Sequence, residues 1–128
     1  MTYVPAPISE LMLIGVAKPG VSNEERIVLR PTQSVRLADF LLAVGSPDPK
    51  TGGAFPIFDN VFWFPDVFIT PPSWVLVYTG PGTSQQTTLP NGESVLTLFW
   101  QRGTTIFNAN NLVPILLRPG AVVVGRRL

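Results

Sequence analysis

The sequence predicts an all-β fold of about eight or nine strands, arranged as an antiparallel sandwich or a barrel. The chain has 128 residues, which suits a single domain spanning residues 1–128 with its own core. Its 14 prolines and 11 glycines leave little room for long helices. The apolar runs are short and separated by turn residues, and they do not alternate with helical segments, so strands are the favoured element.

The strands that we expect in the first half of the chain are apolar runs bounded by proline, glycine or serine. They cover residues 8–17, 25–30, 35–37, 40–44 and 60–64. Ile27 and Leu29 share one face of the second run. The fourth run is apolar on both faces, so we expect it to be covered on both sides. Residues 46–60 are rich in proline and glycine and predict a loop.

The strands that we expect in the second half follow a corner rich in proline. They cover residues 74–78, 95–100, 112–117 and 121–124. Successive side chains of the 74–78 run alternate between an aromatic face and a valine face, which is typical of a strand. The intervening residues 83–93 are polar and predict a loop. The last two runs flank Arg118-Pro119-Gly120, so we expect a closing hairpin there.

The residue inventory excludes several kinds of chemistry. Cysteine and histidine are absent, so thiol catalysis, zinc ribbons, imidazole bases and Ser-His-Asp triads are excluded. The formal net charge is +1 and the basic residues are scattered, which argues against nucleic-acid binding. No apolar stretch approaches the roughly 20 residues that span a bilayer. We expect a cytoplasmic protein because no signal peptide is visible, or a secreted one if a leader has been removed.

Two segments and the scattered carboxylates are candidate chemical sites. The twelve residues from Asp48 to Asp59 have the length of an EF-hand loop and its glycine, but Lys50 stands where an oxygen ligand is needed, so we expect a surface loop. Gly80-Pro81-Gly82 follows a strand but lacks the lysine of a phosphate loop, and we expect a turn. The carboxylates show no paired spacing for hydrolysis. We therefore expect no catalytic residue, no metal and no cofactor.

An unusual surplus of apolar residues remains. The chain is 45% hydrophobic and 13% charged, whereas an average domain carries about 25% charged residues. The outer faces of a sandwich should be polar, so some apolar side chains should meet a partner. Three consecutive aromatics at 62–64 cannot all face one core. The candidate interaction surface consists of Phe55, Phe58, Phe62, Trp63 and Phe64.

Several segments follow one another in the order and spacing of a known family. They are residues 25–32, 35–42, 62–65, 69–72, 74–82, 107–108 and 116–123. Over about residues 8–124 the chain resembles the lamin tail domain, with Phe40 at that family's usual tryptophan and Asp39 at its usual glycine. The resemblance implies an immunoglobulin-like β-sandwich that acts as an interaction module and not as an enzyme.

The function that we expect is a non-catalytic structural or protein-interaction module, with self-association as one form of that role. A phage capsid decoration or tail component is one alternative. A carbohydrate- or peptide-binding sandwich that uses Trp63, Trp74 and Trp100 is another. A hydrolase based on carboxylates is the weakest alternative.

Overall fold

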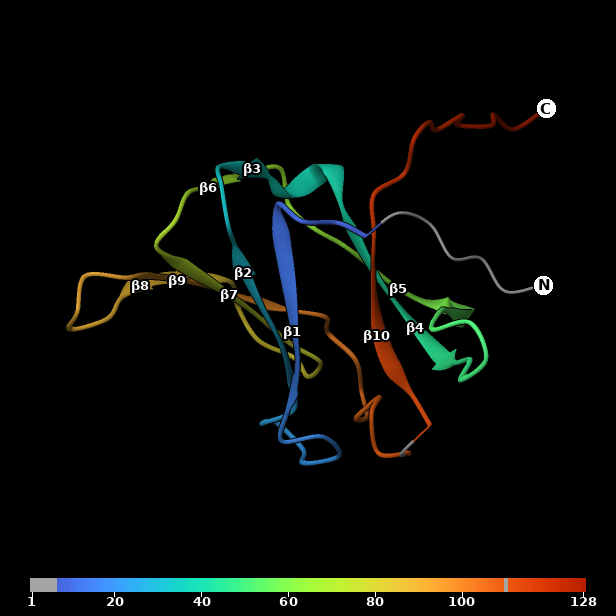
Figure 1. Cartoon of the computed structure of the whole chain (residues 1–128), viewed down its shortest axis with the longest axis horizontal. Coiled ribbons are helices and arrows are strands. Elements are labelled where there is room, and N and C mark those ends of the chain that lie inside the picture. Colours follow the sequence, from blue (N-terminus) through green and yellow to red (C-terminus); the bar gives the residue numbers. More distant parts are fainter. Residues whose placement is uncertain (1–6, 110) are drawn as a thin grey trace.

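The computed structural model describes residues 7–109 and 111–128, and for residues 55–60 it describes the backbone alone. Within these residues the chain forms ten strands and one short 3-10 turn, and no longer helix is present (Figure 1). The prediction of an all-β, sandwich-like fold is confirmed. The strands number ten where we expected eight or nine: short strands lie in two segments expected to be connections, and the strand expected at residues 121–124 is absent.

The larger sheet contains five of the described strands in the order β1-β2-β7-β9-β8. These strands are β1 Leu11–Ala17, β2 Arg26–Pro31, β7 Ser73–Tyr78, β9 Ser94–Phe99 and β8 Gln85–Thr88. All neighbouring pairs are antiparallel except β7 and β9, which are parallel. The expectation of a wholly antiparallel fold is therefore wrong at this one pair. After β7 the chain forms β8, turns back, and then forms β9 between β8 and β7, where β9 runs parallel to β7.

The second sheet contains three described strands in the order β10-β4-β5, and all its pairs are antiparallel. These strands are β10 Val113–Leu117, β4 Leu41–Pro47 and β5 Ala54–Trp63. A two-stranded ribbon of β3 Val35–Arg36 and β6 Phe68–Ile69 lies at one end, followed by the 3-10 turn η1 Leu37–Asp39. β1 and β10 are in contact along one side of the sandwich, where the two sheets meet (Figure 1).

The core forms between the inner faces of the two sheets. β2 and β7 each present alternate side chains inward, and the largest of these are fully buried. Ile27, Leu29, Val75 and Val77 come from the larger sheet, and Leu42 and Val44 come from β4. β4 is buried along residues 41–45, which confirms the prediction that this run is covered on both sides.

Three expectations about connections are wrong. Residues 46–60 form most of a hairpin between β4 and β5, since the chain turns within 48–53 and pairs again from Ala54. The polar segment 83–93 contains β8, which pairs with β9 through its backbone although its side chains are all exposed. No closing hairpin forms at Arg118-Pro119-Gly120, because β10 pairs instead with β4, far away in the sequence, and the described residues 121–128 contain no strand.

Candidate functional site

The three aromatics at the end of β5 alternate between the core and the outside. Phe62 packs partly buried against the core, and its ring lies 5.3 Å from that of Phe64 and 5.5 Å from that of Trp100. Phe64 is 6% exposed, whereas Trp63 between them is 66% exposed. The prediction that at least one of the three points away from the core is therefore confirmed, and that residue is Trp63.

The predicted interaction surface of five aromatics is wrong in part. Phe64 belongs to the core and Phe62 packs against it, because residues two apart in an extended chain lie on the same face. The Phe64 side chain is therefore buried, and that of Phe62 is partly buried. The side chains of Phe55 and Phe58 lie outside the described residues. Of the predicted surface, the structure leaves Trp63 as the exposed aromatic.

Further apolar side chains that the sequence does not single out are exposed: Val122 lines the same hollow as Trp63, and Val67 and Phe68 lie in the segment that follows β5. Val67 is 36% exposed, Phe68 is 74% exposed and Val122 is 66% exposed. We call Trp63, Val67, Phe68 and Val122 the Trp63 end. One sequence signal could have found Phe68: in the short strand β6 it alternates with Ile69, and only one of two adjacent residues can face the core.

An open hollow of about 270 Å³ lies beside Trp63. It is lined by Ala38, Asp39, Phe40, Trp63, Arg118, Pro119 and Val122. Arg118 forms an ion pair with Glu10, and its guanidinium lies 6.0 Å from the centre of the Phe40 ring. The cation in this hollow is thus already engaged, which leaves an apolar depression with few free polar groups.

A small ion-pair cluster holds the Trp63 end in place. The Arg36 guanidinium donates to both carboxylate oxygens of Asp66, at 2.7 and 2.8 Å, and more weakly to Asp39 at 3.3 Å. The hydrogen bond from Arg36 lowers the pKa of the Asp66 carboxyl below its ordinary value, and the group stays exposed. The backbone N–H of Leu37 also donates to the carbonyl of Val67 at 2.9 Å. These bonds join the 65–67 corner to β3 and η1, so Val67 is presented on an ordered framework.

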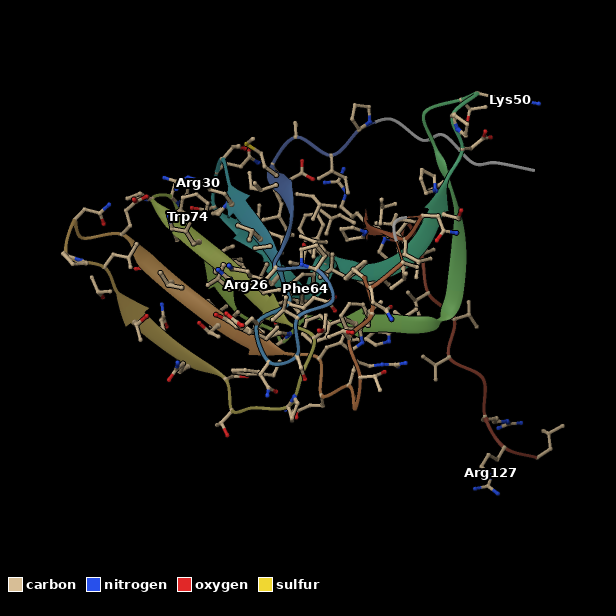
Figure 2. The ribbon with its side chains drawn as sticks, turned by 90° about the horizontal axis from the view of Figure 1, so that it is seen from below. Arg26, Arg30, Lys50, Phe64, Trp74 and Arg127 are labelled. Carbon is tan, nitrogen blue, oxygen red and sulfur yellow. The ribbon has the colours of Figure 1, made fainter. Side chains whose placement is uncertain are left out.

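A second aromatic group lies on the outer face of the larger sheet. The Arg30 guanidinium covers the Trp74 ring at 4.1 Å and forms an ion pair with Glu93 at 2.5 Å. Figure 2 shows Arg30 and Trp74 together on this face. Tyr78 is covered in a similar way by Arg26, at 5.6 Å. Arginine side chains of the same chain therefore already cover a face of each of these two rings.

The three tryptophans do not form one aromatic surface. Trp63 lies at the end of β5 and points outward, whereas Trp74 lies on the outer face of the other sheet. Trp100 is 8% exposed and belongs to the core. A ligand could not stack on all three at once.

One carboxylate, that of Glu25, is buried and joins several backbone segments. The Glu25 side chain is 1% exposed and accepts four hydrogen bonds, from the backbone of Gly20, Ile106 and Phe107 and from the Thr79 hydroxyl. The neighbouring Glu24 is exposed. Only the distant partners explain why Glu25 tolerates burial.

Of the two segments considered as ligand sites, the first turns within 48–53 and continues from Ala54 as β5, and the second, at residues 80–82, leaves β7 as a bend and irregular backbone. The Asp48 carboxylate accepts hydrogen bonds from the Lys50 N–H at 3.0 Å and the Thr51 hydroxyl at 3.2 Å. Gly82 exchanges two hydrogen bonds with the Gln101 side chain. Among the described residues no group of three acidic side chains could hold a metal ion.

Within the same described ranges, no helix has the length and apolar character to cross a bilayer. Comparison of the chain with models of protein families, with curated protein sequences and with solved structures found no match.

Proposed function

We propose that this chain is a non-catalytic structural module that associates with a second copy of itself through the Trp63 end. The observation that carries the proposal is the exposure of Trp63 and Phe68, at 66% and 74%, on a framework held by backbone hydrogen bonds and ion pairs. A monomer gains nothing from ordering two large aromatic side chains in water, whereas an interface uses such residues as anchors.

The available energy is modest. Burying an aromatic side chain fully removes roughly 150–250 Å² from water, so Trp63 and Phe68 at their observed exposures offer about 200–350 Å² per copy and about 400–700 Å² in a two-fold dimer. At about 25 cal/mol per Å² the dimer gains about 10–18 kcal/mol before costs. Association costs an amount of similar size in lost translational and rotational freedom. The proposal therefore predicts association that is weak and depends on protein concentration.

The shape and charge of the Trp63 end favour a second copy as the partner. An indole protrudes next to an apolar hollow, so a two-fold axis can place each indole against the other copy's hollow. The net charge of +1 opposes this approach only weakly. The resemblance to lamin tail domains, whose members serve as interaction modules, supports the same role.

The proposal is tested by sedimentation velocity from micromolar to millimolar concentration. The wild-type chain should shift from monomer toward dimer, and Trp63→Ser combined with Phe68→Ser should remain monomeric. Ile14→Ser is the matched control, because Ile14 is also exposed, at 51%, but lies in β1 of the larger sheet. A wild-type chain that stays monomeric throughout, or a dimer that the double variant leaves intact, contradicts the proposal.

A further inference from the structure

The segment that follows β10 has the composition of a strand without the pairing of one. Residues 121–124 are Ala-Val-Val-Val, and β-branched residues of this kind favour the extended backbone. Val122, Val123 and Val124 are 66%, 95% and 88% exposed. Figure 1 shows this segment, in red, leaving the sandwich and extending away from it. Consecutive exposed valines are costly in water, so this segment is suited to pairing with a sheet edge.

The sandwich offers two open edges in the part of the chain that the structure describes. β1 and β10 cover one another along one side, which leaves β5 and β8 at the outer edges of their sheets. β8 is four residues long and entirely polar, whereas β5 spans Ala54–Trp63, ten residues. A long edge strand presents a row of unpaired backbone groups. β5 is therefore the better acceptor for an added strand.

The register of the smaller sheet brings the valine segment to the correct end of β5. Leu117 pairs with Leu41, and Leu41 pairs with Trp63, so the end of β10 and the end of β5 lie in one row. Residues 118–120 follow β10 there, and Val122 lines the same hollow as Trp63. A strand that enters β5 from its Trp63 end runs antiparallel to it.

We propose that residues 121–125 of one copy add as an antiparallel strand to the free edge of β5 in a second copy, and that the exchange is reciprocal. This rests on the proposed function, because the two copies must first meet at the Trp63 end. Both the donor segment and the acceptor edge lie at that end, so a single two-fold axis can place the donor segment of each copy beside β5 of the other. The valine segment extends away from its own β5, and Pro119 restricts the backbone of the short connection.

The first test is Val123→Pro in the full chain, compared with Val123→Thr. Val123 is exposed and lies outside every strand, so neither change should alter the thermal midpoint of the monomer. Proline removes a backbone donor and blocks strand pairing, whereas threonine keeps both the donor and the preference for extended backbone. Val123→Pro should weaken dimerisation by about tenfold or more, and Val123→Thr should leave it within about threefold.

The second test locates the acceptor by amide hydrogen exchange. The β5 amides that point to its free edge, away from β4, should exchange slowly in concentrated wild-type protein and rapidly after dilution to monomer. Isotope-labelled Val123→Pro chain should show rapid exchange in β5, and an excess of unlabelled wild-type chain should slow it, because the wild-type segment is supplied by another molecule.

Two results would overturn the strand addition while leaving the proposed function intact. One is a dimer that Val123→Pro does not weaken. The other is slow exchange of the free-edge amides of β5 that persists in the dilute monomer, which would mean that the segment folds back onto its own chain. A wild-type chain that never dimerises overturns the proposed function itself.

Discussion

Replacing Glu25 by glutamine tests how the connections at one end of the sandwich are held together. The carboxylate lies just before β2 and is 1% exposed. Its Oε1 accepts from the Thr79 hydroxyl at 2.8 Å and the Ile106 N–H at 2.7 Å. Its Oε2 accepts from the N–H groups of Gly20 at 2.7 Å and Phe107 at 3.0 Å. One side chain thereby joins three segments that are distant in the sequence.

The expected loss of stability depends on which of the two carboxylate oxygens is replaced by the NH₂ group of glutamine. The amide has nearly the size of the carboxylate, but its NH₂ group cannot accept a hydrogen bond. Placing NH₂ at the Oε1 position is the less costly orientation, because the Thr79 hydroxyl can rotate and accept from it. The Ile106 N–H then stays buried without an acceptor, and the remaining bonds lose their charge assistance. Glu25→Gln should therefore lower the free energy of unfolding by about 2–4 kcal/mol.

The assay is urea unfolding followed by the fluorescence of the buried Trp100. A domain of this kind has about 5–15 kcal/mol of stability, so a loss of this size remains measurable in a folded variant. Thr79→Val, which removes one donor, should cost about 1 kcal/mol. Glu24→Gln is the matched control, since Glu24 is exposed, and it should change stability by less than about 0.5 kcal/mol. If Glu25→Gln also falls within about 0.5 kcal/mol of the wild type, the carboxylate does not hold these connections.

Two further predictions concern close packing and acid stability. Gly82→Ala should lower the free energy of unfolding, measured by thermal unfolding, by about 1–3 kcal/mol, because an added Cβ would lie 2.3 Å from the Phe99 ring at the end of β9. Gly103→Ala is the control and should be nearly neutral, since an added Cβ there would meet nothing within 4 Å. Equal losses of stability in the two variants would contradict the packing argument. Hydrogen bonds from Asn91 and Arg30 hold the pKa of Glu93 below its ordinary value of 4.5. Its ionised form therefore stabilises the fold above that value, and this contribution is lost as the pH falls through the folded pKa. The thermal midpoint of Glu93→Gln should fall less on acidification than that of the wild type, and identical pH profiles would contradict this role.

Local patterns in the sequence determined most of the strands and the faces of several of them. The alternation at 74–78 correctly placed Val75 and Val77 on one face, because successive side chains of a strand point in opposite directions. The same period required at least one of Phe62, Trp63 and Phe64 to leave the core. These predictions need no distant partner, since a strand of either sheet obeys the same rule.

Only the tertiary structure decided which strands pair and which aromatic is exposed. β10 pairs with β4 instead of turning back on residues 121–124, and β9 lies parallel to β7. Phe62 and Phe64 face the core, which leaves Trp63 between them exposed, and the two-residue period alone does not say which of the two faces is the inner one. Backbone pairing depends on strand edges that are brought together from far along the chain, and no window of sequence contains both edges. For the same reason the low charge and high apolar content indicated only that some apolar side chains stay exposed. The tertiary structure shows that they include those of the Trp63 end and the valines at 122–124.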